Sequence, residues 1–329
     1  MEENALIIGS ETVRKHLSVQ DVIETVEKTW KWYGEGRIIM PPKITTDMSS
    51  AGVDGWFNTM PCYIAPLNTA GMKIVGGFAG NHALGLPYIK ASLVLISPET
   101  GLLRAVINGD WISDMRTGAQ PAIMARLLAA KADIITIIGA GQQGYTSLLC
   151  MSKVLDIKEV RICDISKKAI ETFISRFVDF PFKVVPFENR ETACRGSDII
   201  ITATTANDTL VKDAWVDPGT LVMTMGSFRE TDYDLIRNAD LLAVDHPEQA
   251  LHRGNFKELG ESRELTIETF DIVVPYILAG KSRRGRRKGT DRICAQLVGM
   301  GCLDVAVASL LYNRILESGD EVLKADMSK

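Results

Sequence analysis

The sequence has few cysteines and no long hydrophobic run, and both absences narrow the class of protein. Its six cysteines are scattered over 329 residues, and no two stand in the C-x-x-C spacing of zinc knuckles and thioredoxin-type sites. The longest apolar runs, such as Ile134–Ala140, fall far short of the roughly 20 residues that span a bilayer. We therefore expect buried, reduced cysteines and no membrane-spanning helix.

Histidine is also scarce, and positive charge is not in excess. The four histidines form no H-E-x-x-H motif, so the sequence predicts no metal site. Lysine and arginine number 37 against 41 acidic residues, and the net charge of −4 argues against a general nucleic-acid binder. Acidic residues open the chain, where a secretory signal peptide would carry bases. We expect a cytoplasmic protein that binds neither nucleic acid nor membrane.

The hydrophobic pattern changes along the chain. Short β-rich segments separated by turns occupy the first third: Trp56–Met60, Met72–Val75, Ser92–Ile96 and Leu103–Ile107. From Asp133 onward, strands and helices alternate with short connections, which predicts a parallel doubly wound sheet. The later segment Gly301–Leu316 has one apolar face of helical period, and we expect it to pack back on the first domain.

These patterns predict an α/β protein of two domains. Residues 118–302 are expected to form a Rossmann-type, doubly wound parallel sheet. Residues 1–117 and 303–329 are expected to form a discontinuous α+β domain.

A glycine-rich turn carries the strongest functional signal. Gly139-Ala140-Gly141-Gln142-Gln143-Gly144 has the form G-x-G-x-x-G, with a predicted strand before it and a predicted helix after it. In such a turn the first glycine permits the tight bend, the second lets the backbone approach a pyrophosphate, and the third lets helix and strand pack closely. The partial positive charge of the helix N-terminus then faces the phosphates. These six residues are predicted to bind a dinucleotide.

The next strand ends at Asp164, about 20 residues further on. A carboxylate there accepts hydrogen bonds from the adenosine ribose and repels a 2′-phosphate. No arginine follows directly, although Lys167 and Lys168 come slightly later and could reach a phosphate. We therefore expect NAD(H) to be favoured over NADP(H).

Three bases of the first domain stand in apolar, glycine-rich or proline-rich settings. Lys73 lies in Gly71-Met-Lys-Ile-Val-Gly-Gly77, Arg116 opens an alanine-rich helical stretch, and Lys43 follows two prolines. A lysine in an apolar strand is rarely buried without a partner. Two interpretations stay open: a structural ion pair or a surface-reaching stem, and a clamp for the carboxylate of a substrate.

With these residues in view, nearly the whole chain resembles the ornithine cyclodeaminase/mu-crystallin family. The matching segments, specific in their order and spacing, are Met60-Pro61, Gly71–Gly77, Gly85–Pro87, Pro98–Leu102, Met115–Ala119, Ile138–Gly141, Trp215–Gly219, Val244-Asp245 and Asp304–Ala306.

The resemblance implies a two-domain NAD(P)-dependent protein, usually a homodimer through its first domain. It implies that Lys43, Lys73 and Arg116 hold the carboxylate of a small substrate. The first of these bases is commonly arginine in the family, so Lys43 is a departure that keeps the charge but loses the bidentate fork. We add Met60 and Tyr88 as substrate-binding residues, and Thr117, Thr204, Met225, Gly226 and Ser227 as cofactor-binding residues.

Two further departures bear on the reaction. True ornithine cyclodeaminases resemble this chain but carry acids where it has Ser227 and Asn58, and both acids hold amines of a diamine. With serine at position 227, the chain is similar to the imine reductases of the mu-crystallin type. We therefore predict hydride transfer at the C–N bond of an α-imino or α-amino acid, as in a Δ1-pyrroline-2-carboxylate or ketimine reductase or an alanine dehydrogenase.

Lys73 and Ser227 are the predicted catalytic residues. An apolar setting and a nearby cation would lower the pKa of Lys73 toward neutrality, which suits proton transfer. Ser227 could hydrogen-bond the imine nitrogen or the nicotinamide amide, or it could merely cap a helix that begins near Asp232.

Two other functions remain as alternatives. One is a cyclodeaminase, a lyase that recycles NAD+ within each turnover. The other is a non-catalytic, crystallin-like protein that binds a small anionic ligand.

Two surface features also allow more than one interpretation. The run Lys281–Lys288 is densely basic and could bind a phosphate, a membrane surface or a nucleic acid, but a solvated loop or a partner for ion pairs between subunits is favoured. Tyr88 and Lys90 share one face of a predicted strand and could line the pocket.

Overall fold

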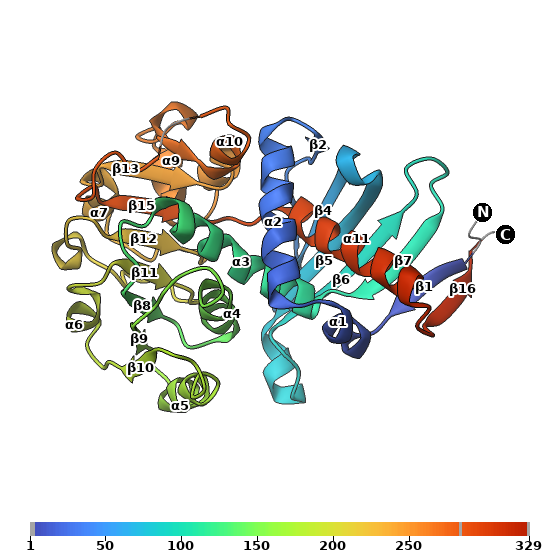
Figure 1. Ribbon diagram of the computed structural model, residues 1–329, viewed down its shortest axis with the longest axis horizontal. Coiled ribbons are helices and arrows are strands. Elements are labelled where there is room, and N and C mark those ends of the chain that lie inside the picture. Colours follow the sequence, from blue (N-terminus) through green and yellow to red (C-terminus); the bar gives the residue numbers. More distant parts are fainter. Residues whose placement is uncertain (1–3, 283–284, 328–329) are drawn as a thin grey trace. The chain divides into compact units, whose positions relative to one another are not determined.

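The computed structural model describes residues 4–282 and 285–327, and the chain folds into two compact units (Figure 1). Unit 1 consists of Met1–Arg116 and Met300–Lys329, and unit 2 consists of Thr117–Gly299. The helix α3 (Asp110–Leu128) begins in unit 1 and continues into unit 2. The α/β class with a parallel sheet is confirmed.

Unit 1 contains a largely antiparallel sheet in the order β16-β1-β7-β6-β5-β4-β2, with β3 also paired to β4. Its strands are β1 (Asn4–Ile8), β2 (Ile38–Ile39), β3 (Ile44–Asp47), β4 (Gly55–Ile64), β5 (Thr69–Phe78), β6 (Ile89–Ile96), β7 (Leu103–Asn108) and β16 (Leu323–Asp326). The four strands predicted from the sequence are confirmed as the central ones, and the sequence patterns missed the short edge strands. The β6–β7 hairpin forms as expected, because the Ser97 N–H donates to the Leu102 carbonyl at 2.9 Å and Gly101 takes the left-handed conformation (φ +74°).

Among the described residues, the α-helices that belong wholly to unit 1 are α1 (Ser10–His16), α2 (Val19–Gly34) and α11 (Gly301–Ser318). The predicted capping box of α2 is present, with Ser18 and Asp21 each accepting from the other's backbone N–H. The apolar helix α11 contacts β4, β5, β6 and α2, so it packs on the sheet as the sequence predicted. A Cβ on Gly301 would come within 2.8 Å of the Met60 Cβ, which shows how closely the helix approaches β4.

The opposite face of this sheet carries another row of apolar side chains. Pro61, Met72, Val94 and Val106 are paired across β4, β5, β6 and β7, and each is half-buried. Because side chains alternate along a strand, these residues point away from the face that α11 covers. The sheet of unit 1 therefore has an apolar face that no helix of the same unit covers among the described residues.

Unit 2 contains a parallel sheet in the order β10-β9-β8-β11-β12-β15-β13-β14. Its strands are β8 (Ile134–Ile138), β9 (Glu159–Cys163), β10 (Lys183–Pro186), β11 (Ile199–Thr202), β12 (Leu221–Thr224), β13 (Leu241–Val244), β14 (Ile272–Val273) and β15 (Ile293–Gln296). The chain runs outward from β8 to β10 and then returns to the other side of β8 with β11. Loops on the two sides of this switch point diverge, which is where open α/β sheets bind their ligands.

The strand β15 is a feature that the sequence patterns did not predict. It inserts between β12 and β13, so the strands of the second half do not follow chain order. Its four residues, Ile-Cys-Ala-Gln, are all buried and give no alternating pattern. A strand covered on both faces has no polar face to reveal its period.

The remaining α-helices of unit 2 are α4 (Gln142–Met151), α5 (Lys167–Ser175), α6 (Arg190–Cys194), α7 (Tyr233–Arg237), α8 (Pro247–Ala250), α9 (Lys257–Glu261) and α10 (Val274–Leu278). Short 3-10 helices occur at Ser49–Ala51, Ala65–Leu67, Ala79–Leu84, Asp213–Trp215, Gly254–Phe256 and Ile267–Thr269. All six cysteines lie in the described part of the chain, and each is buried and outside any disulfide. Within the described ranges, every helix is too short or too polar to cross a membrane.

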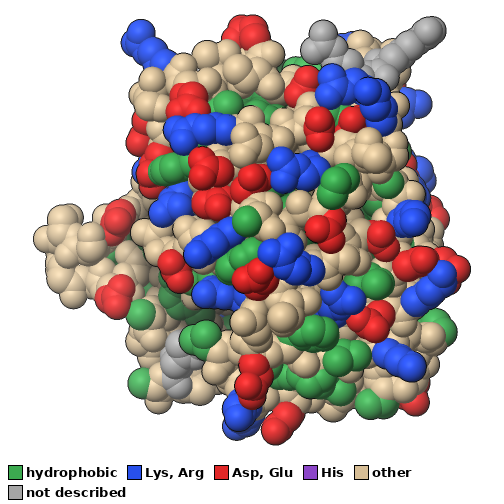
Figure 2. All heavy atoms as spheres, turned by 90° about the vertical axis from the view of Figure 1, so that its left-hand side faces the viewer, with side chains coloured by type: hydrophobic (Ala, Val, Ile, Leu, Met, Phe, Trp, Pro, Cys, Tyr) green, Lys and Arg blue, Asp and Glu red, His purple; other side chains and the backbone are tan. Residues whose placement is uncertain are grey.

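The surface drawn in Figure 2 carries basic and acidic side chains interspersed, with small hydrophobic groups between them. In the basic run Lys281–Lys288, Arg283 and Arg284 lie outside the described residues. The described part folds back on unit 2: Arg286 Nε donates to the Leu128 carbonyl at 2.6 Å, at the end of α3. The N–H groups of Arg287 and Lys288 donate to one Asp291 oxygen, each at 2.8 Å. This part of the run therefore serves the fold of its own unit.

Candidate active site

The glycine-rich turn of unit 2 has the geometry that its sequence predicts. Gly139 follows β8 with φ at +114°, and a Cβ there would lie 2.4 Å from the Ala203 carbonyl oxygen. A Cβ on Gly144 would lie 2.1 Å from the Gly139 carbonyl oxygen, so only glycine lets α4 begin this close to β8. Gly141 is the N-cap of α4, and a Cβ there would meet nothing within 4 Å. The turn therefore leaves open space where its backbone can approach a phosphate, and these residues fit a dinucleotide.

Asp164 lies beside this turn, directly after β9. Its Oδ2 accepts from the Ala140 N–H at 2.7 Å, and its Oδ1 accepts from the Ser166 N–H at 2.8 Å. These bonds fix a half-buried carboxylate next to the fingerprint, with acceptor capacity left on both oxygens. The neighbouring Gln142 is exposed and Gln143 is half-buried, both in the first turn of α4.

The other predicted cofactor residues of unit 2 follow β11 and β12. Thr204 lies after β11, whereas Met225, Gly226 and Ser227 lie after β12, and these two strands are neighbours. Thr117 is the first residue of unit 2, within α3. The structure therefore brings Thr204 and the Met225–Ser227 loop to the same edge of the sheet, because parallel strands end on the same side.

Ser227 is exposed and does not cap a helix. The helix α7 has Asp232 as its N-cap, whose side chain accepts from the Leu235 N–H. The alternative interpretation, in which Ser227 caps that helix, is therefore wrong. The exposed hydroxyl at the sheet edge remains consistent with a ligand contact.

Unit 1 contains a buried cluster of two cations and one carboxylate. Lys73 on β5 is 1% exposed, Arg116 on α3 is 7% exposed, and Asp304 on α11 is 0% exposed. Lys73 Nζ and Arg116 Nε both donate to Asp304 Oδ1, each at 2.9 Å. Lys73 Nζ also donates to Ser113 Oγ at 3.3 Å. The ion-pair interpretation of these two bases is thus realised, with one oxygen of Asp304 accepting from both.

Asp304 is the member of this cluster that the sequence interpretation left without a role. It stands in the first turn of α11, and its neighbours from Gly301 to Ala308 are all buried. An acid in an otherwise apolar helical segment requires a buried partner, which is the signal that could have identified it. Its second oxygen, Oδ2, is buried without a hydrogen-bond partner. The cluster therefore contains an acceptor that is ready for one more donor.

The cluster changes the acid–base properties of Lys73. Burial lowers the pKa of Lys73 to about 8, and the positive charge of Arg116 adds to that effect. The charge of Asp304 and its hydrogen bond oppose the shift, as does the more weakly acting charge of Asp114. Lys73 can therefore hold or release a proton close to neutral pH, as the sequence predicted.

Met60 is the predicted substrate residue that lies beside this cluster. It is the cross-strand partner of Lys73 and is buried on the same face of the sheet. Lys43 is half-buried and directly precedes β3, which pairs with β4. Asn58 on β4 is buried and accepts a hydrogen bond from Thr45 Oγ1 at 2.6 Å. The uncharged Asn58 is thus already engaged with a neighbouring strand.

Tyr88 and Lys90 lie further along the sheet. The Tyr88 hydroxyl accepts from Trp56 Nε1 at 3.2 Å, and a Cβ on Gly77 would come within 2.7 Å of the Tyr88 ring. Gly77 is four residues from Lys73 on β5, so Tyr88 packs about 13 Å along the strand from the lysine position. Lys90 is paired with Asp110. Among the described residues, no cluster of His, Cys, Asp and Glu could hold a metal ion.

Comparison with known proteins finds relatives that match nearly the full length of the chain. The alanine dehydrogenase of Archaeoglobus fulgidus is 30% identical over 318 residues, which cover 94% of this chain and 95% of that protein. The solved structure of an archaeal alanine dehydrogenase dimer with bound NAD superimposes with a TM-score of 0.91 at 29% identity, covering 98% and 99% of the two chains. The Δ1-pyrroline-2-carboxylate reductase of Thermococcus litoralis, solved in complex with NADH and L-proline, superimposes with a TM-score of 0.89 at 28% identity, covering 95% and 98%.

The family profile spans the units described above. Residues 3–319 match the profile of the ornithine cyclodeaminase/mu-crystallin family, including the glycine-rich turn of unit 2 and the Lys73, Arg116 and Asp304 positions of unit 1. The resemblance inferred from the sequence motifs is thereby confirmed. This chain belongs to the ornithine cyclodeaminase/mu-crystallin family.

Proposed function

We propose that this protein is an NAD(H)-dependent oxidoreductase that acts on the C–N bond of an α-imino or α-amino acid. Unit 1 holds the carboxylate of the substrate, and unit 2 holds the nicotinamide dinucleotide. The observation that carries the proposal is the buried pairing of Lys73 and Arg116 on one oxygen of Asp304. A guanidinium and an ammonium group held close together offer charge-assisted donors of the kind that bind a carboxylate.

The relatives support this class of reaction. One is named an alanine dehydrogenase and another a Δ1-pyrroline-2-carboxylate reductase, and the solved structures hold NAD, or NADH with L-proline. In each name the substrate is a small amino or imino acid. The glycine-rich turn from Gly139 to Gly144 fits the dinucleotide that these relatives bind.

The residues of unit 1 account for the substrate's side of the chemistry. A bound nicotinamide supplies or accepts the hydride. In the reductive direction the imine carbon gains that hydride and the imine nitrogen gains a proton, so C=N becomes CH–NH. Lys73 and Arg116 would hold the carboxylate next to that carbon, which would fix the position of the carbon for the transfer. Lys73 also holds a proton that it can release near neutral pH.

Ser227 and Asp304 take supporting parts in this proposal. The exposed Ser227 hydroxyl, after β12, would donate to the carboxamide of the bound nicotinamide. Asp304 orients both cations, and its unpartnered Oδ2 accepts from the substrate nitrogen when that nitrogen carries a proton. Met60, the cross-strand partner of Lys73, lies beside the apolar stem of that lysine. Lys43 and Tyr88 remain proposed substrate contacts on the strength of the sequence alone.

Asp164 sets the proposed preference for NAD(H). We expect the wild-type protein to bind NADH at least about tenfold more tightly than NADPH, because the carboxylate accepts from the ribose and repels a 2′-phosphate. Asp164→Ala should narrow this gap in a fluorescence titration with both cofactors. Asp164→Asn separates the causes, since it removes the charge but keeps an acceptor for the Ala140 N–H.

The control for this comparison is Asp156→Ala, an exposed acid shortly before the same strand, β9. It should leave both affinities unchanged. Equal affinities of the wild-type protein for NADH and NADPH would overturn the assignment of Asp164.

The reaction class follows from the neutral residues at two positions. Cyclisation of ornithine requires carboxylates that hold two amines, whereas Ser227 and Asn58 carry no charge, and Asn58 is bonded to Thr45. A cyclic imine or simple α-imino acid has a single nitrogen and needs one hydrogen-bond partner. We therefore favour a reductase or dehydrogenase over a cyclodeaminase. The intact fingerprint of Gly139–Gly144 and the bases Lys73 and Arg116 favour an enzyme over a non-catalytic binding protein.

A substrate panel tests this choice. Cyclic imines, and 2-oxo acids supplied with ammonia, are incubated with NADH, and ornithine is incubated separately with catalytic NAD+. We expect stoichiometric NADH oxidation with at least one α-imino acid and no proline or ammonia from ornithine. Efficient proline formation would establish the cyclodeaminase instead. Tight binding of imino acids without any turnover would establish the binding protein.

We further propose that the protein is a homodimer through unit 1. The half-buried apolar row of Pro61, Met72, Val94 and Val106 lies on the sheet face opposite α11, and a second copy would bury it. The archaeal alanine dehydrogenase that superimposes on this chain is itself described as a dimer. Light scattering that gives the mass of a single chain at micromolar concentration would contradict the proposal.

A further inference from the structure

Glu230 is a carboxyl group of unit 2 that lies fully buried between two loops. Its Oε1 accepts from the Thr204 N–H at 3.1 Å and from Thr204 Oγ1 at 2.9 Å. Its Oε2 accepts from Thr202 Oγ1 at 2.8 Å and from the Gly226 N–H at 2.9 Å. One side chain therefore joins the end of β11, the loop after β11 and the loop after β12.

These four bonds account for the burial of the charge. A carboxylate offers about four acceptor positions, and four donors fill them. Glu230 forms no ion pair with any residue that the structure describes, so the donors alone stabilise the anion. Burial raises the pKa of Glu230, and the bonds from Thr202 and Thr204 oppose that rise. The four hydrogen bonds therefore fix the carboxyl group of Glu230 and, at the same time, the loop segments that donate them.

The surrounding backbone leaves Glu230 little freedom. A Cβ on Gly226 would lie 2.6 Å from the Glu230 carboxyl group, so the loop after β12 can approach only because it has no side chain there. On the other side of that loop, a Cβ on Gly254 would lie 3.0 Å from the Gly226 carbonyl oxygen. The Gly226 backbone is packed between the two.

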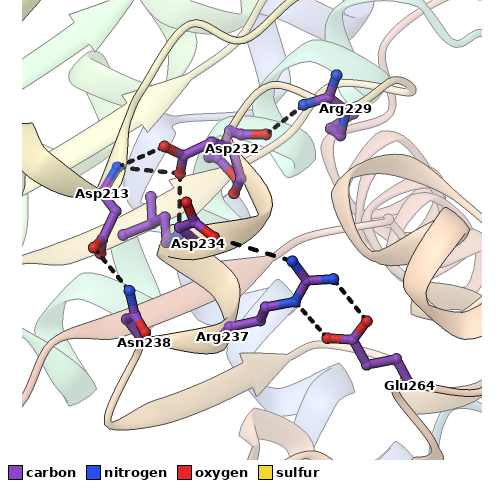
Figure 3. A network of polar contacts seen from close by, with 9 residues as sticks. Asp213, Arg229, Asp232, Asp234, Arg237, Asn238 and Glu264 are labelled. Atoms are coloured by element: carbon purple, nitrogen blue, oxygen red, sulfur yellow. Dashed lines mark hydrogen bonds and ion pairs between the residues drawn. The ribbon is translucent and has the colours of Figure 1, made fainter.

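The main chain at Glu230, later in the loop after β12, is anchored to Asn255, a residue outside both loops. The N–H groups of Glu230 and Thr231 both donate to Asn255 Oδ1 at 3.0 Å. The next residue, Asp232, caps α7 and accepts from the Asp213 N–H, within the polar network of Figure 3. Glu230 therefore projects from a fixed backbone toward loops that it holds together.

We propose that Glu230 is a positioning residue for the nicotinamide half of the cofactor. By fixing the spacing between Thr204 and the Met225–Ser227 loop, it presents both to the nicotinamide. The inference rests on the proposed function, in which a dinucleotide spans the switch point of the sheet. The adenosine half then lies by Asp164 on the β9 side, and the nicotinamide half lies by β11 and β12.

The test compares a ligand that reaches only the adenosine half with the whole cofactor. Glu230→Gln keeps the size of the side chain but places an amide NH2 group, itself a donor, in front of two of the four donors. We expect the Kd of NADH to rise about tenfold and the Kd of ADP to stay within about twofold, measured by calorimetry. The rate of hydride transfer should fall further than the loss of NADH affinity accounts for, because the nicotinamide is held less well.

The matched control is Asp198→Asn. Asp198 lies at the opposite end of β11, where its Oδ2 accepts from the Ile134 N–H at 3.0 Å. The control should leave the affinities for both ligands unchanged. Equal losses of NADH and ADP affinity in Glu230→Gln, no loss of either, or the same NADH-specific loss in the control would each overturn the proposal.

A milder variant covers the case in which Glu230→Gln does not fold. Thr202→Val removes one donor to Oε2 at nearly constant volume, and it should raise the Kd of NADH about two- to fivefold without changing that of ADP. An unchanged NADH affinity in this variant would count against the proposal. Because both ligands are measured without substrate, a failure of imine turnover in the wild-type protein would reject the proposed function and leave the role of Glu230 to be decided by binding.

Discussion

Arg116→Ala is expected to raise the KM for the imino acid strongly and to lower kcat/KM by about 30- to 5,000-fold. Truncating one member of a buried, charge-assisted pair costs about 2–5 kcal/mol, and the same change in transition-state binding gives this range. The affinity for NADH should stay within about twofold, since Arg116 belongs to unit 1, in the cluster with Lys73 and Asp304 that we propose binds the substrate carboxylate. Steady-state kinetics and a cofactor titration on the same preparation give both quantities.

The control for this variant is Arg314→Ala. Arg314 also pairs with a carboxylate of unit 1, through two bonds of 2.6 Å to Asp21. This pair links α11 to α2 and lies further along α11 than Asp304, outside the Lys73–Arg116–Asp304 cluster. Its loss should lower thermal stability and leave KM unchanged. A similar KM in Arg116→Ala and the wild-type protein would show that Arg116 is purely structural.

Lys73→Met is expected to lower kcat by about 10²- to 10⁴-fold, the usual contribution of a positioned proton donor. Methionine matches the length of the apolar stem, so the loss reports the ammonium group and its bonds to Asp304 and Ser113. NADH affinity is the internal reference and should not change. The corresponding control is Lys90→Met, which removes a lysine from the neighbouring strand β6 and should keep near-normal kcat.

The pH profile separates a proton donor from a structural lysine. The pKa of Lys73 is lowered to about 8, so the protonated form predominates below that pH and is lost above it. Reduction, which consumes the proton, should therefore decline as pH rises through about 8, whereas oxidation of the amine should increase over the same window. In Arg116→Ala the pH at which the reductive rate declines should be higher, because the charge of Arg116 helps to lower the pKa of Lys73. A profile that is the same in Lys73→Met and the wild-type protein would remove Lys73 from the proton path.

The dinucleotide half of the site could be predicted from the sequence because its signals are local. The steric need for glycine at Gly139 and Gly144, the helix that starts after Gly141 and the acid at Asp164 all lie within one strand–helix–strand unit. Alternation of short strands and helices likewise predicted the parallel sheet. The strand β15 was missed because its four residues are buried on both faces and show no period.

Other parts of unit 1 could be predicted for a similar reason. The capping box at Ser18 and Asp21 and the turn at Gly101 are fixed by neighbouring residues. The apolar period of Gly301–Leu316 correctly predicted that α11 packs on the sheet of the first domain. The edge strands β2, β3 and β16 could not be predicted, because they are short and depend on the strands beside them.

The sequence by itself determined which chemical groups this protein has: a fingerprint for a dinucleotide, bases in apolar settings, and neutral residues where a cyclodeaminase carries acids. Only the tertiary structure decided how the groups act on one another. Lys73 and Asp304 are 231 positions apart and Arg116 and Asp304 are 188 positions apart, so no local pattern could show that both cations share one carboxylate oxygen. The pKa of Lys73 depends on that arrangement, because burial and neighbouring charges are properties of the folded chain.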